Sequence, residues 1–328
     1  MPSSMTHTYF GLDVMKQLPP IYQNKIKDKQ EYFKLFCQGS DPFMFYHFLL
    51  GNKAKKMAKI QKNIHTTNTK KFFINTIKII KENNLIHNQE VMSYLYGHIC
   101  HYYLDLNTHP FIYYKSGIFN KNDKNTYKNN GLHQKIEYNI DLYMIKKREN
   151  QPPHRYKVYK NLFNIKNFSK ELSEVIDESI EKTYHYKNIS KTYLTCTKYM
   201  KNFYKYINYD PTGIKFYIYK LIDKLTKDNI IKIEILSFHR DFESNLSYLN
   251  LNHLPWTLPW DNQKKFTTSF FELYEKAKND AINTIIKVTD MLNKNELNQP
   301  LLDELFKNLS YTTGRPCQEK LKMQFFEN

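Results

Sequence analysis

Apolar side chains recur every three to four residues along most of the 328-residue chain, which is the spacing of amphipathic helices. This spacing predicts helices over residues 21–36, 53–63, 68–83, 89–104, 132–147, 168–187, 190–207 and 214–226. A further helix begins at Phe270, where Leu273, Ala277, Ala281 and Ile285 fall on one face. The helix over 89–104 is apolar on nearly all sides, so we expect it at the centre of the fold. The chain is therefore predicted to be all-α.

Other stretches interrupt the helical pattern. Residues 115–131 are polar and rich in asparagine, and residues 253–260 contain two prolines, so both are predicted to be loops. Residues 230–235 are rich in β-branched side chains and fit either a helix or a strand. Pro110 predicts that the central helix ends at about residue 109.

The clearest break in the chain is Gln151-Pro152-Pro153. It divides the chain into two helical regions, residues 1–150 and residues 151–328. We expect the two regions to pack on each other as one compact unit.

The composition is that of a packed globular protein, since 41% of the residues are hydrophobic and 16% are aromatic. The formal charge of +17 is typical of proteins that bind nucleic acids or anionic membranes. However, only four of the 49 basic residues are arginine, and the abundance of Lys, Asn, Ile and Tyr fits an AT-rich genome. We therefore interpret most of the charge as a solvated surface rather than a binding track.

The four cysteines lie far apart and form no Cys-x-x-Cys motif, which indicates reduced thiols and no thiolate metal site. No stretch of about 18 apolar residues is present, so no transmembrane segment is predicted. The first residues lack the pattern of a secretory signal. Together these features predict a cytoplasmic protein.

Histidines and carboxylates are paired at helical spacing in the first half of the chain. His101 precedes Asp105 by four residues, and His133 precedes Glu137 by four residues. On a helix this spacing places the two β-carbons about 5–6 Å apart on one face. Burying an imidazole with a carboxylate is costly unless a cation compensates, and zinc prefers such nitrogen and oxygen ligands. The two pairs therefore predict a multi-metal hydrolytic site.

The ordered set of these residues resembles the zinc-dependent phospholipases C of bacteria, whose helical fold is shared with single-strand nucleases of fungi and plants. The resemblance covers about residues 1–145 and includes His7 near the start, Asp41 and His65 upstream of the first pair, and His109 after it. It implies a multi-helix fold with a buried cluster of up to three zinc ions. The implied ligands are Asp41, His65, His101 and Asp105 for the first ion, His109, His133 and Glu137 for the second, and His7 and Asp105 for the third.

The resemblance also implies the chemistry, in which zinc activates a water molecule that attacks the phosphorus of a phosphodiester such as a phospholipid headgroup. Asp41 would be both a zinc ligand and the general base. From its sequence context alone, Asp41 could instead be a helix N-cap preceding Pro42. His65 is expected in a polar joint between the helices 53–63 and 68–83.

Two further residues are uncertain from the sequence. His98, three residues before His101, is either close to the metals or a packed core histidine. The family completes the third site with an N-terminal tryptophan, which this chain lacks. The hypothesis is that the Pro2 amine, exposed by removal of Met1, takes that place.

Two other functions remain open. The same metal core cleaves single-stranded nucleic acid in the related nucleases, and the chain is basic. Alternatively, the zinc ions only stabilise the helices of a non-catalytic protein that binds a partner through its basic surface.

Overall fold

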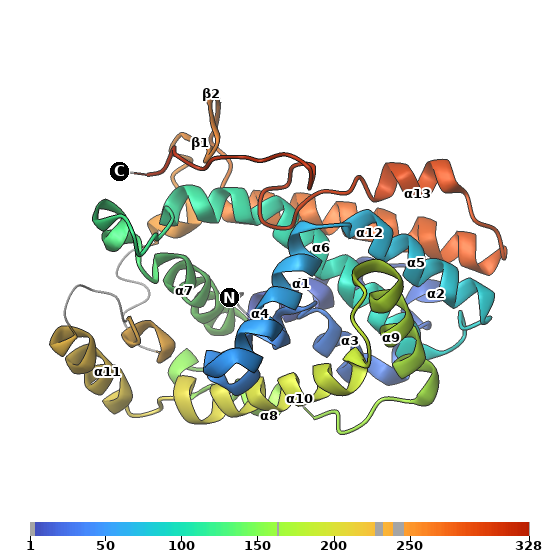
Figure 1. Ribbon diagram of the computed structural model, residues 1–328, viewed down its shortest axis with the longest axis horizontal. Helices are drawn as coiled ribbons and strands as arrows, with labels where there is room; N and C mark the ends of the chain where they lie inside the picture. The colour runs from blue at the N-terminus through green and yellow to red at the C-terminus, as the bar shows by residue number, and fades with distance from the viewer. Residues whose placement is uncertain (1–3, 163, 227–231, 239–245, 328) are drawn as a thin grey trace.

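The computed structural model describes residues 4–162, 164–226, 232–238 and 246–327 (Figure 1). Its helices are α1 (Ser4–Gln17), α2 (Pro20–Gln23), α3 (Gln30–Phe36), α4 (Gly51–Thr66), α5 (Thr69–Glu82), α6 (Gln89–Ser116), α7 (Leu132–Glu149), α8 (Val158–Asn161), α9 (Lys170–Tyr184), α10 (Ile189–Asn202), α11 (Ile214–Leu225), α12 (Phe270–Asn293) and α13 (Gln299–Leu305). The only sheet among the described residues is a hairpin of β1 (Trp256–Leu258) and β2 (Asp261–Phe266). The predicted all-α class is confirmed.

Short helical turns connect several of these helices. The 3-10 turns are η1 (Lys27–Lys29), η2 (Asp41–Leu49), η3 (Lys124–Asn129), η4 (Pro153–Arg155), η7 (Glu234–Leu236) and η9 (Ser247–Leu249), and η5 (Phe203–Asn208) is a π-helix. The predicted helix over 21–36 is therefore divided into α2 and α3, and the one over 190–207 ends in a π-helix. The predicted loop over 115–131 contains η3. Residues 230 and 231 of the ambiguous stretch lie outside the described residues.

The prediction of a loop over residues 253–260 was incomplete. Pro255 and Pro259 flank a three-residue strand, β1, which pairs with β2 in antiparallel fashion. Trp256 lies opposite Phe266 in this pairing, and their rings stack with centroids 4.9 Å apart. Aromatic cross-strand pairs of this kind stabilise short hairpins, which explains why a strand forms between two prolines.

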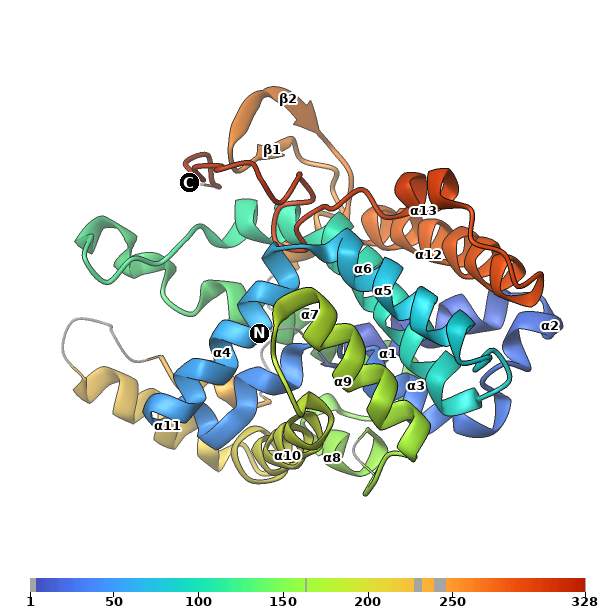
Figure 2. The ribbon, with the colours of Figure 1, turned by 45° about the vertical axis from the view of Figure 1, so that its right-hand side comes forward.

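The long helix α6 is the centre of the fold. Most of its side chains are buried, as the apolar pattern predicted, and it packs against α1, α3, α7 and α12 (Figures 1 and 2). The side chain of Asn88 begins this helix by accepting hydrogen bonds from the backbone N–H groups of Glu90 and Val91.

The prediction that α6 ends near residue 109 was wrong, because the helix continues through Pro110 to Ser116. A proline inside a helix removes the hydrogen bond to the carbonyl four residues earlier, at a cost of about 3 kcal/mol. That carbonyl, of Leu106, lies so close to the backbone of Gly314 that a Cβ there would be 2.8 Å away. The apolar surroundings of Phe111 and Ile112, which are both buried, keep the chain helical beyond the proline.

The hydrophobic core includes residues from both sides of the Gln151-Pro152-Pro153 break. Across this boundary, the hydroxyl groups of Tyr96 and Thr289 are 2.7 Å apart, and Tyr103 donates to the carbonyl oxygen of Leu305. A capping box of Ser269 and Glu272 begins α12 beside α6. The division into two regions remains a prediction. No helix of the described part of the chain is long and apolar enough to cross a bilayer.

Candidate metal centre

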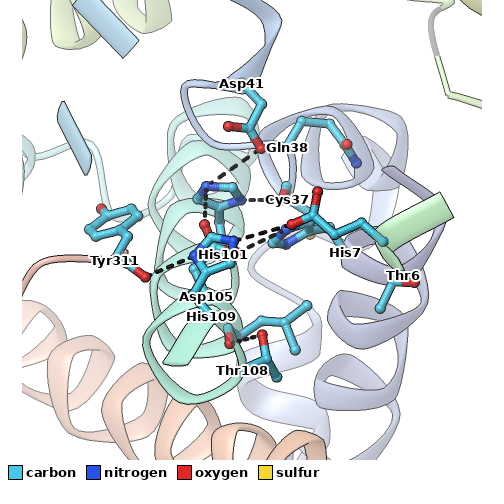
Figure 3. A network of polar contacts seen from close by, with 12 residues as sticks. Thr6, His7, Cys37, Gln38, Asp41, His101, Asp105, Thr108, His109 and Tyr311 are labelled. Atoms are coloured by element: carbon cyan, nitrogen blue, oxygen red, sulfur yellow. Dashed lines mark hydrogen bonds and ion pairs between the residues drawn. The ribbon is translucent and has the colours of Figure 1, made fainter. Parts of the chain in front are cut away.

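His101 and Asp105 lie one turn apart on the buried face of α6, with 3.3 Å between His101 Nε2 and Asp105 Oδ2. His101 Nδ1 is 3.1 Å from the carbonyl oxygen of Cys37 (Figure 3). A carbonyl oxygen only accepts hydrogen bonds, so Nδ1 carries the proton and Nε2 presents a lone pair to the cluster. This is the arrangement expected of a metal-ligating histidine.

The backbone before Asp41 makes room for the His101 ring. Gly39 has a φ angle of +52°, which favours glycine, and a Cβ at this position would lie 2.2 Å from His101 Cδ2. The close approach of the α3–η2 connection to α6 therefore depends on Gly39.

Asp41 and His65 approach His101 from two other elements. Asp41, the first residue of η2, has Oδ1 3.6 Å from His65 Nε2 and Oδ2 3.8 Å from His101 Nε2. The interpretation of Asp41 as an N-cap is wrong, because Ser40 holds that position and no side-chain cap bond forms. The expectation for His65 is also corrected, since this residue lies in the last turn of α4 and is buried.

A further set of donors lies between α6 and α7. The Oε1 atom of Glu137 lies 3.1 Å from His133 Nε2 and 3.4 Å from His109 Nε2. His109 Nδ1 donates to the carbonyl oxygen of Tyr311, 2.9 Å away, which leaves its Nε2 facing Glu137. Because α6 continues past Pro110, His109 remains on the same face as Asp105, with 3.7 Å between Nε2 and Oδ1.

His7 completes the cluster from α1. Its Nε2 atom lies 3.2 Å from Asp105 Oδ1, and its ring stacks on that of His101 with centroids 4.4 Å apart. Asp105 is thus within 4.0 Å of four histidines, namely His7, His65, His101 and His109. It lies between the separate donor groups, as the bridging ligand of the predicted cluster would.

Helix α1 is held in place by a carboxylate that the sequence did not reveal. Asp141 on α7 is fully buried and accepts hydrogen bonds from the backbone N–H groups of Met5 and Thr6, at 3.0 and 2.7 Å. It also accepts from the Thr6 hydroxyl. The signal was its position, four residues after Glu137 on the same face of α7.

The structure brings all eight predicted ligands together, in three groups that could each hold a metal ion. The groups are His7, His101 and Asp105; Asp41, His65 and His101; and His109, His133 and Glu137. Within each group the donor atoms all lie within 4.8 Å of one another. Nitrogen and carboxylate oxygen donors at this separation fit zinc. The role of each residue as a ligand remains a prediction.

Buried atoms inside the cluster show where positive charge belongs. Asp41 Oδ2 and Asp105 Oδ2 have no hydrogen-bond donor among the described residues. Burial and the nearby Asp105 carboxylate raise the pKa of Asp41 to about 8. Burial lowers the pKa of His65 to about 3, so that imidazole stays neutral and free to bind a cation. Divalent cations would compensate the two buried Oδ2 atoms that receive no hydrogen bond from the described residues.

In the third group, two neighbouring carboxylates favour the protonated form of His109. Burial alone would lower the pKa of His109, but Asp105 and Glu137 outweigh it and raise the pKa to about 9. Burial would raise the pKa of Asp105, yet His109, His101 and His7 lower it well below its ordinary value.

Five of the eight clustered side chains line a pocket of about 700 Å³. Asp41, His65, His109, His133 and Glu137 line its base, together with Gln61, whose amide nitrogen is 3.2 Å from Asp41 Oδ1. The walls come from α4, from the 117–131 segment and from the C-terminal segment at Thr312. A substrate would therefore reach the group of His109, His133 and Glu137 first, because His109 and His133 are partly exposed while His101 is fully buried.

The sequence model of the zinc-dependent phospholipase C family matches residues 6–190, more than half of the chain. The chain belongs to this family. The resemblance inferred from the histidine and carboxylate spacing is therefore confirmed, as is the dependence on zinc. Comparisons with curated proteins and with solved structures give no match.

Two sequence hypotheses concern His98 and Pro2. His98 packs between Tyr94 and Phe72, with ring centroids 4.5 and 5.3 Å away, and belongs to none of the three groups. This favours the core interpretation of His98. Pro2, suggested as a replacement for the family's tryptophan, lies outside the described residues.

Proposed function

We propose that the protein is a zinc-dependent phosphodiester hydrolase of phospholipase C type. The observation that carries this proposal is the convergence of three donor groups around the buried Asp105, with five of their eight side chains lining an accessible pocket. We assign the zinc ligands as the sequence suggested. Asp41, His65, His101 and Asp105 hold the first ion, His109, His133 and Glu137 the second, and His7 and Asp105 the third.

Bound zinc supplies Lewis acidity, which lowers the pKa of water and neutralises charge on the phosphoryl oxygens. In our proposal Asp41 accepts the proton of the attacking water. It combines a place on the pocket floor with an Oδ2 atom that has no donor among the described residues. Gln61 orients this carboxylate through Oδ1, so that Oδ2 remains available for the water.

Asp41→Asn tests this role. We expect the turnover number for a soluble phosphodiester such as bis(4-nitrophenyl) phosphate to fall about 100-fold or more, within the usual range for a lost general base. The zinc content and thermal midpoint should be measured in parallel, to separate chemistry from metal loss. The matched control is Asp280→Asn on the exposed face of α12. Unchanged turnover in Asp41→Asn would count against its role as a base.

A phospholipid headgroup is the substrate class that the pocket favours over single-stranded nucleic acid. Nucleic-acid channels track the phosphate backbone with many cations. Lys62 is the only lysine or arginine among the described residues that line this pocket. Release of headgroups from phospholipid vesicles should therefore exceed cleavage of a single-stranded oligonucleotide under the same conditions. Faster cleavage of the oligonucleotide would favour a nuclease. A zinc-loaded protein with neither activity would be a non-catalytic zinc protein.

The cytoplasmic location also remains a proposal. Its support is that Cys37, Cys100, Cys196 and Cys317 are all free thiols, three of them buried. Fractionation of the source cells, followed by detection of the protein in the cytosolic or the secreted fraction, distinguishes the two locations.

A further inference from the structure

Helix α11 carries an apolar stripe on its outer side. Ile214, Tyr217, Ile218, Leu221, Ile222 and Leu225 follow one another at three- and four-residue intervals, and each is exposed. The exposed fractions of Tyr217 and Leu225 reach 70% and 73%. In a soluble helix this spacing normally marks the face that packs on the core. Here the same pattern faces outward, which makes α11 an unusual surface element.

The orientation of α11 is fixed by two buried carboxylates, one near each end. Asp210 accepts hydrogen bonds from the backbone N–H of Phe216 and from the Ser237 hydroxyl. Asp223 accepts from the backbone N–H groups of Ile233 and Glu234, at 2.8 and 2.9 Å. These bonds hold the side of the helix that carries Phe216 and Asp223 against the protein, so the apolar stripe is presented to the outside by specific contacts.

The exposed charges of the segment that leads into and forms α11 are positive, and an acidic residue, Glu234, lies in the neighbouring turn η7. Residues 191–226 contain lysines at 191, 198, 201, 205, 215, 220 and 224, whereas their acidic residues are Asp210 and Asp223, both buried. Lys215 donates to the carbonyl oxygens of Tyr206 and Tyr209, and Tyr206 is itself exposed next to the helix. An apolar stripe between lysines and exposed tyrosines is the surface of a helix that lies in the interface of an anionic bilayer.

Helix α11 lies at the same end of the molecule as part of the pocket wall (Figures 1 and 2). Gly131 lines the pocket, and a Cβ there would be 3.0 Å from Ile235, in the segment that Asp223 anchors to α11. Figures 1 and 2 both place α11 at the same end as the 117–131 segment, which includes the half-exposed Phe119 of the pocket wall.

We propose that α11 is an interfacial docking helix, which binds an anionic phospholipid surface and turns the pocket towards lipid headgroups. The docking itself needs no catalysis. Only the second part, the delivery of lipid to the pocket, rests on the proposed phospholipase C function. A second copy of this chain would be a competing occupant of the same stripe, and the experiment distinguishes the two.

The test is co-sedimentation of the full-length, zinc-loaded protein with vesicles of phosphatidic acid, which contains no phosphodiester bond and therefore remains intact. We expect the protein to bind these vesicles, and we expect binding to weaken in about 0.5 M NaCl, where surface charges are largely screened. Leu221→Ser/Leu225→Ser should reduce binding at least about tenfold, because both side chains lose their insertion into the apolar region. The matched control, Ile21→Ser/Leu254→Ser, removes two equally exposed apolar side chains elsewhere and should bind like the wild type.

Several outcomes would overturn the proposal. These are absence of vesicle binding by the wild type, equal binding by Leu221→Ser/Leu225→Ser, or an equal loss in the control. A dimer in light scattering that Leu221→Ser/Leu225→Ser dissociates would assign the stripe to a second copy instead.

Turnover separates docking from catalysis. Leu221→Ser/Leu225→Ser should lower hydrolysis of phospholipid in vesicles but leave turnover of soluble bis(4-nitrophenyl) phosphate within about twofold of the wild type, because it changes only interfacial binding. An equal loss with both substrates would contradict docking. Vesicle binding without turnover of either substrate would support docking and refute the proposed function.

Discussion

The Nε2 atoms of His65 and His101 lie 2.9 Å apart in the interior of the protein, and each faces the carboxylates of Asp41 and Asp105. The hydrogen bond from His101 Nδ1 to the Cys37 carbonyl leaves the His101 Nε2 atom with a lone pair. Two imidazoles and two carboxylates at these distances could bind a cation, which would offset the cost of burying them.

Removing zinc should therefore destabilise the folded protein. A ligand that binds the native state at a concentration a thousandfold above its Kd stabilises it by about 4 kcal/mol. We expect a chelator to lower the thermal midpoint by several degrees and added zinc to restore it. Elemental analysis of the purified protein should give up to three zinc ions per chain. A protein with no zinc and a thermal midpoint unaffected by the chelator would contradict the assignment of the cluster.

Replacing Gly39 should disrupt the centre without removing any donor. In Gly39→Ala the new methyl group would overlap the His101 ring at 2.2 Å, and the residue would also adopt a φ angle of +52°. We expect loss of zinc and of activity. Gly213→Ala is the control, because its φ angle is +80° but no atom lies within 4 Å of the added Cβ. That variant should bear a similar backbone strain of about 1–2 kcal/mol and keep its full zinc content. Equal zinc content in the two variants would show that the His101 contact is unimportant.

Asp141→Ala should loosen α1 and with it His7. Two backbone N–H groups and a hydroxyl would lose their buried acceptor, at a cost of about 2–4 kcal/mol in the free energy of unfolding. We also expect about one zinc ion fewer per chain, because His7 is on the same turn of α1. Urea unfolding measures the free energy of unfolding, and elemental analysis measures the zinc content.

The control for Asp141 is Asp123→Ala, which removes an exposed carboxylate that accepts from the backbone N–H of Asn125. It should cost about 1 kcal/mol, the usual effect of losing a helix cap, and should leave the zinc content unchanged. If Asp141→Ala behaves like Asp123→Ala, Asp141 does not position α1.

Asp13 makes the stability of α1 depend on pH. Partial burial would raise its pKa, but hydrogen bonds from Arg148 and Tyr274 lower it below the ordinary value of 3.8. A lowered carboxyl pKa means that the stabilisation is complete above pH 3.8 and is lost as the pH falls through the native-state pKa. Because the pair is partly exposed, we expect Asp13→Asn to lose only about 1 kcal/mol at pH 7. Urea unfolding at several pH values should show this difference shrinking below pH 4 (about the unfolded pKa). A difference that stays constant down to pH 3 (about one unit lower) would contradict the role of this charge.

The donors of the centre could be predicted from the sequence because their positions follow from helical geometry. His101 with Asp105, and His133 with Glu137, must share a helix face at a spacing of four residues. The family resemblance then supplied the distant members, such as His7. The groups that orient the donors could not be predicted in this way. The carbonyl oxygens of Cys37 and Tyr311 bind His101 and His109, but every residue has a carbonyl, so residue type carries no signal.

The errors in the fold arose where tertiary contacts outweigh local preference. Pro110 is a strong helix breaker, yet α6 continues because the buried residues after it pack in the core. Trp256 forms a strand between two prolines because Phe266 stacks on it from β2. In both cases the deciding partner is distant in sequence or belongs to the whole core, and local periodicity does not contain it.

The continuity of α6 through Pro110 has a mechanical consequence. His101, Asp105 and His109 lie on one uninterrupted helix. Each is displaced from the one before by about 6 Å along the helix axis, which is the rise of four helical residues. The spacing of these three donors along the helix is thereby set by backbone geometry rather than by adjustable side chains. A one-residue insertion between His101 and His109 would rotate one donor by about 100° and dismantle the array, even with every ligand type retained.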